Sequence, residues 1–325
     1  MQRSQETVFL YSGQGSQHYQ MAAELFGRRG SFYRRAMAID EMLREYLGQS
    51  VVAAVYEPGR KVSDWFDRLT LTYPAVFLVE CALTGSLLDV GLRPDRVVSV
   101  SMGVYAALVA SESLSLSDAV RAVSTQAQLL QAYCSNGGLL AVPGLRLEQA
   151  EAFAKDFDCD LATINVKSPC VVAVDSGRLQ SAEAELRLRG ANPQRLMVSK
   201  PFHSRWVEGA RDACTSLLSS VQLRRPEIPV YCCVGEGAVG EFSASYLWRL
   251  IREPIRFDAT VEVLCQEIGA RFVDVGPSGT LATALRHYKT KDRWGGQYEV
   301  QMLLSPFGGA LGRFEQLLGN GCEGI

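Results

Sequence analysis

The sequence contains little histidine and almost no net charge. Only three histidines, His18, His203 and His287, occur among its 325 residues, so few side chains can serve as a general base near neutral pH. The 33 Lys and Arg residues nearly balance the 35 Asp and Glu residues, which leaves a formal net charge of -2. Because nucleic-acid-binding proteins are usually clearly basic, we expect no nucleic-acid partner.

Long apolar runs and paired cysteines are missing as well. The N-terminus has too short an apolar core for a secretory signal, and no apolar run approaches the length of a membrane span, so we expect no membrane partner. The nine cysteines are scattered without a CxxC pair, which is typical of reduced thiols in the cytoplasm. The sequence has no metal-ligand spacing and no phosphate-binding motif, so we predict neither a metal nor a cofactor.

The remaining composition indicates a globular α/β protein. Apolar residues make up 47% of the chain and charged residues 21%, which are globular values. The apolar run 8–11 predicts a buried strand that leads into a Gly-rich loop, and the run 96–100 predicts a second strand that enters a tight turn and a helix. The stretch 74–90 predicts a buried helix with Pro74 in its first turn.

The pattern changes after residue 126. Over about seventy residues the predicted elements follow the order β-α-β-β-α-β, which is the ferredoxin-like arrangement. We therefore predict a large α/β-hydrolase-like domain of residues 1–126 and 198–325, with an inserted ferredoxin-like small domain of residues 127–197.

A candidate nucleophile lies in the tight turn after the second predicted strand. Residues 99–103 read SVSMG, which is the GxSxG pattern of a nucleophile elbow with its first glycine replaced by Ser99. Such a turn lifts the Ser101 hydroxyl above the sheet and sets it at a helix N-terminus, where a developing oxyanion is stabilised. The pattern alone is weak, because small residues in a strand–turn–helix unit are also common packing devices.

Four further segments occur with this turn in a recognisable order. They are GQGSQ at 13–17, KPFHS at 200–204, RLIREPIRF at 249–257 and DVGPSGTL at 274–281. Together with SMGVYAAL at 101–108, they resemble the GQGSQ, HSxGEYAAL, PFHS, PVRW and EVGPG segments of the malonyl-CoA:acyl-carrier-protein acyltransferase family. The predicted inserted domain also lies where this family has one.

The resemblance implies a role for five residues. Ser101 would be the nucleophile and His203 its general base, and the backbone N–H groups of Gln14 and Met102 would form the oxyanion hole. The histidine would be oriented by the main-chain carbonyl of Leu250.

The implied chemistry has two steps, because the serine takes an acyl group from a thioester and a thiol or water then removes it. The rate should rise with pH through about 6 to 7, as an imidazole loses its proton. His18 and His287 lie outside the motifs, and we interpret them as surface or packing residues.

Three positions bear on the substrate. Val100 replaces the histidine that usually precedes the serine, and we expect it to contact the acyl group together with Phe202. The family holds the malonyl carboxylate with an arginine in an RGxLMQ segment, where this chain has QAQLLQ with Gln126 first. Glutamine cannot form the bidentate ion pair, so malonyl should be a poor substrate, and Gln126→Arg should restore it. Arg121, one or two turns earlier, is an alternative cation.

Three functions remain open. The pattern is similar to that of discrete acyl hydrolases of trans-acyltransferase polyketide pathways, which carry glutamine for arginine and clear stalled acyl groups from carrier proteins. An acyltransferase that moves a non-carboxylated acyl unit between carriers, or from CoA to a carrier, also fits. The departures at Ser99, Val100 and Val104 leave a catalytically silent docking protein as the third.

The resemblance implies an acyl carrier protein with a phosphopantetheine-bound acyl group as partner, and acyl-CoA as a second donor. Carrier proteins are typically acidic, and the chain has a local cluster of positive charge at 286–293. Arg286, Lys289, Lys291 and Arg293 are therefore candidate docking residues. A solvated loop explains the same cluster equally well.

Overall fold

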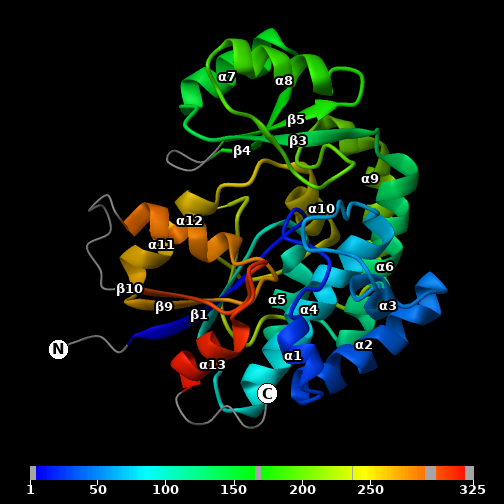
Figure 1. Ribbon diagram of the computed structural model, residues 1–325, viewed down its shortest axis with the longest axis vertical. Coiled ribbons are helices and arrows are strands. Elements are labelled where there is room, and N and C mark those ends of the chain that lie inside the picture. The colour runs from blue at the N-terminus through cyan, green and yellow to red at the C-terminus, as the bar shows by residue number, and fades with distance from the viewer. Residues whose placement is uncertain (1–4, 165–169, 236, 290–297, 319–325) are drawn as a thin grey trace.

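The computed structural model describes residues 5–164, 170–235, 237–289 and 298–318, which form a large and a small part (Figure 1). The large part contains a six-stranded sheet in the order β10-β9-β1-β2-β7-β8, in which all pairs are parallel except β7 with β8. Its strands are β1 (Glu6–Tyr11), β2 (Arg96–Ser99), β7 (Val230–Cys232), β8 (Ala238–Val239), β9 (Ala270–Asp274) and β10 (Tyr298–Met302). The α/β class of the prediction is therefore confirmed.

Helices cover both faces of this sheet. Alternate residues of β1 point to opposite faces, so Phe9 and Tyr11 pack into one core while Val8 and Leu10 pack into the other. The helical elements of the large part are α1 (Ala23–Gly27), α2 (Ser31–Leu47), α3 (Val51–Val55), α4 (Leu69–Asp89), η1 (Ser101–Gly103), α5 (Val104–Ala110), α6 (Leu116–Tyr133), η2 (Arg205–Ala210), α9 (Arg211–Ser219), α10 (Ala244–Arg252), α11 (Phe257–Glu267), α12 (Thr280–Lys289) and α13 (Ala310–Leu318).

Helix α4 lies at the centre of the larger core. It is long and apolar enough, by length and composition alone, to cross a membrane, which corrects the expectation that no run approaches that length. However, 89% of its most apolar window is buried inside the protein, as is typical of a core helix. The helix begins at Leu69, so Pro74 lies inside it and not in its first turn as predicted. Thr72 and Tyr73 therefore also belong to α4.

The small part is a four-stranded antiparallel sheet with two helices on one face. Its elements are β3 (Gly137–Val142), α7 (Leu147–Asp156), β4 (Asp160–Thr163), β5 (Cys170–Asp175), α8 (Leu179–Leu188) and β6 (Gln194–Arg195). The sheet order β4-β5-β3-β6 and the element order β-α-β-β-α-β confirm the ferredoxin-like prediction.

The boundaries between the two domains stay a proposal. The small sheet lies within 137–195, inside the predicted range 127–197, but the first predicted boundary falls within α6, which continues to Tyr133. The likeness of the large domain to α/β-hydrolases also stays a prediction, since it concerns the single strand–turn–helix unit of β2, η1 and α5.

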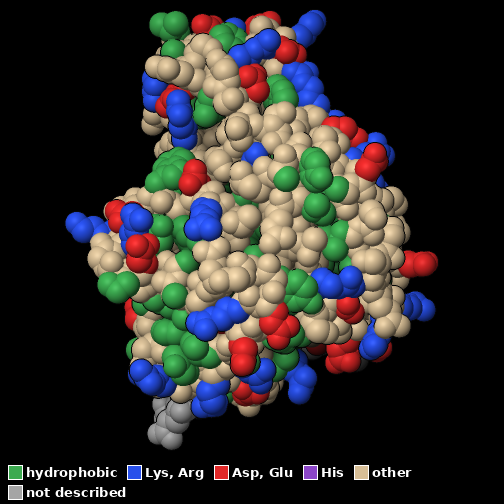
Figure 2. Space-filling view, turned by 90° about the vertical axis from the view of Figure 1, so that its right-hand side faces the viewer, with side chains coloured by type: hydrophobic (Ala, Val, Ile, Leu, Met, Phe, Trp, Pro, Cys, Tyr) green, Lys and Arg blue, Asp and Glu red, His purple; other side chains and the backbone are tan. Residues whose placement is uncertain are grey.

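The surface carries charges of both signs. Figure 2 shows basic and acidic side chains interspersed over the face that carries α2, α6 and α9, which agrees with the nearly balanced composition. A field of a single sign does not cover that face, so electrostatic attraction of a partner would have to come from a local group of residues.

Candidate active site

The turn after β2 has the geometry of a nucleophile elbow. Ser101 has a φ of 54°, in the left-handed region that non-glycine residues rarely occupy, and such strain is characteristic of functional sites. A Cβ atom at Gly103 would lie 2.5 Å from the carbonyl oxygen of Ser12, so this position has to be glycine. Ser99 replaces the other glycine of the pattern without strain, because its hydroxyl lies 3.3 Å from the Cys232 sulfur on β7.

The Gly-rich loop after β1 packs directly on this elbow. A Cβ atom at Gly13 would lie 2.9 Å from the Ser101 Cβ atom and 3.0 Å from the Val100 carbonyl oxygen. The side-chain nitrogen of Gln14, Nε2, donates to the Met102 sulfur at 3.6 Å. The two segments that the resemblance assigns to the oxyanion hole are thus in contact, and the direction of their N–H groups stays a prediction.

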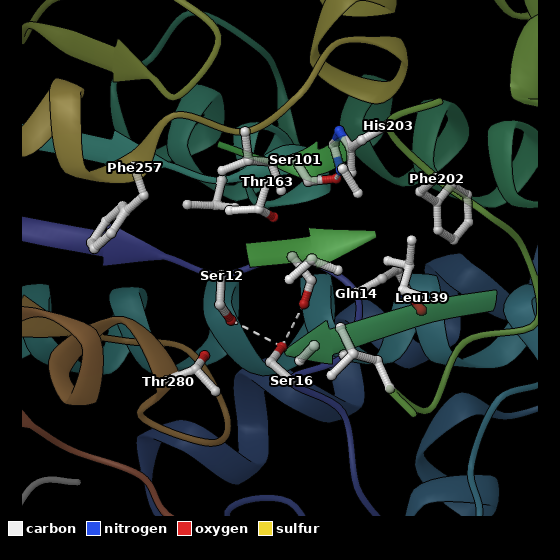
Figure 3. A pocket seen from close by; sticks show the side chains of 18 of the residues that line it. Ser12, Gln14, Ser16, Ser101, Leu139, Thr163, Phe202, His203, Phe257 and Thr280 are labelled. Carbon is white, nitrogen blue, oxygen red and sulfur yellow. Dashed lines mark hydrogen bonds between the residues drawn. The ribbon is translucent and has the colours of Figure 1, made fainter. Parts of the chain in front are cut away.

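His203 completes a Ser–His pair, and Figure 3 shows the two side chains next to each other at the cavity. Its Nε2 atom lies 3.0 Å from Ser101 Oγ, and its Nδ1 atom lies 2.8 Å from the main-chain carbonyl oxygen of Glu253. Because a carbonyl only accepts, Nδ1 carries the proton and donates it, and Nε2 is left free to accept the serine proton.

The prediction that Leu250 supplies the orienting carbonyl is wrong. Leu250 lies inside α10, whereas Glu253 caps the end of that helix with an extended backbone (φ -87°, ψ 153°). This conformation turns the Glu253 carbonyl away from the helix axis toward the imidazole. The adjacent Ile251 carbonyl accepts the backbone N–H of His203 at 2.9 Å, so the end of α10 fixes both the backbone and the ring of the histidine.

Burial changes the acid–base properties of this pair. The His203 side chain is only 3% exposed, and burial lowers the pKa of its imidazole to about 4, although the hydrogen bond to Glu253 raises it in part. The imidazole is therefore neutral, and able to act as a base, throughout the physiological range. This corrects the expected titration at pH 6 to 7.

The Ser–His pair opens into a cavity of about 290 Å³ between the two parts of the molecule. The described residues that line it come from the Gly-rich loop, the elbow, the small sheet, α11 and α12, and none is Asp, Glu, Lys or Arg. They are Ser12, Gly13, Gln14, Gly15, Ser16, Val100, Ser101, Leu139, Ala141, Ala162, Thr163, Val171, Leu196, Phe202, His203, Ile255, Phe257, Thr280, Leu281 and Ala284. Val100 and Phe202 are thus placed where an acyl group would lie.

The small part is joined to this wall by backbone hydrogen bonds. Ile255 N donates to the Ala162 carbonyl at 2.9 Å, and Ile164 N donates to the Ile255 carbonyl at 2.8 Å. Thr163 and Ile255 both line the cavity. Ile255 lies two residues after Glu253, whose carbonyl orients the histidine. The small part therefore supplies an apolar wall of the cavity at a fixed position.

Gln126 does not line the cavity, contrary to its assignment as a substrate-binding residue. It is fully buried, and its amide oxygen accepts hydrogen bonds from the hydroxyls of Tyr73 and Tyr105, each at 2.8 Å. The alternative cation, Arg121, donates instead to Asp118 and to the Ser220 carbonyl on the far side of α6. Neither side chain is therefore among the described residues that meet the acyl group.

The remaining predicted residues lie apart from the Ser–His pair. Arg286 is exposed on α12 and donates to the Val300 carbonyl at 3.4 Å, and Lys289 is the last residue of that helix. Lys291 and Arg293 lie outside the described residues, so the docking cluster stays a prediction. His18 is buried, with its ring nitrogens 2.7 Å and 3.3 Å from two main-chain carbonyl oxygens, as expected of a packing residue.

Sequence reasoning missed one buried group beside the site. Glu80 is fully buried on α4 and accepts hydrogen bonds from Ser12, the first residue of the Gly-rich loop. A signal was present, since a lone carboxylic acid inside the apolar run PAVFLVECALTGSLL is costly without a partner.

The chain is similar to known proteins over most of its length. Residues 8–300 match the family model for the acyl transferase domain. The chain is 33% identical over 305 residues to the polyketide biosynthesis acyltransferase homolog BaeD of Bacillus velezensis, covering 94% of this chain and 93% of that protein. It is 31% identical over 282 residues to the homolog PksD of Bacillus subtilis, covering 86% of each protein. The acyltransferase domain from module 8 of the salinomycin polyketide synthase superposes with a TM-score of 0.84 at 26% identity, covering 98% of this chain and 76% of that one.

The buried imidazole predicts an unusual pH profile. Only the neutral ring can accept the Ser101 proton, so the rate of serine acylation is full above the His203 pKa and is lost as the pH falls through about 4. Between about pH 6 and 8 the rate should be flat. The measurement is the single-turnover acylation rate against pH, with circular dichroism to confirm folding at each pH.

His203→Ala serves as the control for this profile. It should lower acylation by about a hundredfold and remove the acid limb, because the titrating group is gone. A wild-type midpoint between pH 6 and 7 would contradict the burial of the imidazole.

Proposed function

The chain belongs to the acyl transferase family, and from this premise we propose that it is a hydrolase that clears non-carboxylated acyl groups from carrier proteins in polyketide biosynthesis. The polyketide context is supported by the names of BaeD and PksD, which the chain matches over most of their lengths. The hydrolase assignment is supported by the sequence resemblance alone, because the discrete acyl hydrolases carry glutamine at the position of Gln126.

The proposed chemistry uses the Ser–His pair twice. Ser101 Oγ attacks the thioester carbonyl while His203 Nε2 takes its proton, and the C–S bond then breaks as the departing thiol receives that proton. A water molecule gives a proton to the same Nε2 atom and attacks the acyl-enzyme. The ester C–O bond then breaks, Ser101 Oγ takes that proton, and the free acid leaves. The N–H groups of Gln14 and Met102 would stabilise the oxyanion of both tetrahedral intermediates.

One observation carries the choice of substrate class, namely the absence of charge from the described lining of the cavity. The lining is made of aliphatic, aromatic and small hydroxyl side chains. A malonyl carboxylate placed there would be buried without a cation, which costs several kcal/mol, whereas a methyl or longer alkyl end gains from the same surroundings (~0.8 kcal/mol per CH₂). We therefore propose acetyl or longer uncharged acyl groups as substrates.

We propose an acyl carrier protein, acting in the cytoplasm, as the partner that presents this acyl group. The eight cysteines in the described part of the chain form no disulfide bonds, which is usual in a reducing compartment. Arg286 on α12 is exposed near Thr280 and Ala284, which line the cavity, so an acidic carrier could be held at that side.

Replacement of the nucleophile tests the proposed function. Ser101→Ala should abolish covalent acylation and the release of acid from acetyl or longer acyl carrier proteins. It should leave the fold intact, because alanine keeps the Cβ atom of serine at this left-handed position. The readouts are intact-protein mass spectrometry, release of free acid, and thermal melting. For wild type we expect a transient adduct and free acid. A stable adduct that is passed to a second carrier would favour the transferase, and no adduct would favour the docking protein.

The uncharged cavity predicts the order of substrates. The ratio of kcat/KM for malonyl over acetyl carrier protein should lie well below one for wild type, by about a hundredfold, because burying an unpaired carboxylate costs several kcal/mol. A ratio above one would show that a cation reaches the substrate, and the proposed substrate class would be wrong.

Gln126→Arg then tests whether position 126 can change that ratio. Because Gln126 does not line the cavity, we expect the ratio to stay within about threefold of wild type while Tm falls by about 5 °C or more, since the guanidinium is buried between two tyrosines without a carboxylate. Gln128→Arg, on the exposed face of the same helix, is the matched control and should leave both quantities unchanged. A large rise in the ratio would restore Gln126 to the substrate site.

A further inference from the structure

Three polar side chains on helix α4 bind β1 and the loop that follows it. Thr84 Oγ1 lies 3.0 Å from the Tyr11 hydroxyl near the end of β1, and Glu80 binds Ser12 one residue later. Thr72 Oγ1 donates to the side-chain oxygen of Gln14 at 3.1 Å. Each is buried in a helix that is otherwise almost entirely apolar.

Glu80 makes the strongest of these attachments. Its Oε1 atom accepts the backbone N–H of Ser12 at 2.7 Å and the Ser12 hydroxyl at 3.0 Å. Within the described residues Oε2 has no hydrogen-bond partner, and burial raises the pKa of the carboxyl group well above its usual value. Burial therefore favours the neutral form of Glu80, which accepts two hydrogen bonds from Ser12, and this burial costs stability that a purely apolar core would not lose.

The attachment reaches the reacting serine through the loop itself. Ser12 Oγ lies 3.0 Å from Ser16 Oγ, as the dashed line in Figure 3 shows, and Ser16 Oγ donates to the Gly13 carbonyl at 2.7 Å. Gly13 in turn touches Ser101 so closely that a Cβ atom would not fit. A displacement of Ser12 would thus move Gly13 and the following N–H group of Gln14 relative to the nucleophile.

A second buried carboxyl group confines Ser12 from the opposite side. Asp274, at the end of β9, accepts the Gly276 and Ala282 N–H groups at 2.9 Å and 2.8 Å. A Cβ atom at Gly276 would overlap the Ser12 hydroxyl, so the turn that Asp274 holds lies directly against Ser12. Ser12 is therefore clamped between α4 and this turn.

We propose that Glu80 is a positioning residue that holds the Gln14 N–H group at the oxyanion position, with Thr72 fixing the Gln14 side chain. This inference rests on the proposed function, because it assumes that Ser101 forms an acyl-enzyme through an oxyanion. Glu80 does not touch the substrate, since it is not among the described residues of the cavity lining. Its effect on the reaction passes entirely through Ser12 and the loop.

Two substitutions of Glu80 distinguish the effect of its hydrogen-bond acceptor from the effect of its side-chain size. Glu80→Met keeps the approximate size but removes the acceptor, so the loop should drift and the acylation rate constant at saturating acyl carrier protein should fall by about 10- to 100-fold. Glu80→Gln keeps a neutral oxygen toward Ser12 and should retain the rate within about threefold. The concentration of substrate at half-saturation should change little in either, since the acyl pocket is intact.

Inhibition by phenylboronic acid is a measurement that a loss of stability alone would not change. Its boron forms a bond with Ser101 Oγ while the serine proton passes to His203, and an oxygen of the tetrahedral boronate occupies the oxyanion position. Glu80→Met should weaken its inhibition by about the same factor as the acylation rate, whereas Glu80→Gln should not.

Thr84→Val is the matched control, because it removes a buried α4 hydrogen bond to β1 one turn further from the loop. It should lower Tm without changing acylation or phenylboronic acid inhibition. If Glu80→Met does not fold, Thr72→Val tests the same clamp at Gln14, with an expected loss of about tenfold in acylation rate and in boronate affinity.

Two results would overturn the proposal. One is a folded Glu80→Met or Thr72→Val with wild-type acylation and boronate inhibition, and the other is a Glu80→Gln as impaired as Glu80→Met. Failure of the proposed function would look different, because wild type itself would then form no acyl-enzyme with any acyl carrier protein.

Discussion

The active centre depends on the contact between the ends of two adjacent parallel strands. β1 and β2 pair in a register that sets Tyr11 opposite Ser99, so the loop after β1 and the elbow after β2 leave the sheet at the same level. Gly13 and Gly103 then permit an approach that any side chain would prevent. Backbone packing therefore brings together Ser101, which is the proposed nucleophile, the loop proposed to stabilise its oxyanion, and the start of α5. The side chains that hold the loop are arranged around this contact.

Burial around that contact favours the neutral forms of two titratable groups. Removal from water lowers the pKa of His203 to about 4 and raises the pKa of Glu80 well above its usual value. Both shifts are caused by burial, and the described residues that line the cavity beside His203 include no charged side chain. In such surroundings the hydrogen bonds to an oxyanion are stronger than they would be in water.

Sequence patterns were sufficient where local chemistry decides the structure. The strand–turn–helix around Ser101 and the ferredoxin-like order of the small part follow from local patterns of residues. The pairing of Ser101 with His203, 102 residues apart, follows only from the resemblance to the acyltransferase family. Leu250 was assigned wrongly because the sequence does not show where the helix ends. Glu253, at the end of α10, has an extended backbone, and its carbonyl therefore points toward His203. The clamp at Glu80 was missed because its partner, Ser12, is 68 residues away.

Gln126 aligns with the family's arginine in sequence, but its side chain lies in the core and not in the cavity. Two tyrosine hydroxyls converge on its amide oxygen, so this part of the core is arranged around an acceptor. Arginine has only donors, and it could enter only if both hydroxyls turned away and a buried charge went without a carboxylate. The proposed discrimination against a carboxylated acyl group therefore rests on the uncharged lining of the cavity, which includes none of Tyr73, Tyr105 and Gln126. Substituting any one of these three residues should change the stability of this core and leave the charge that the substrate meets unchanged.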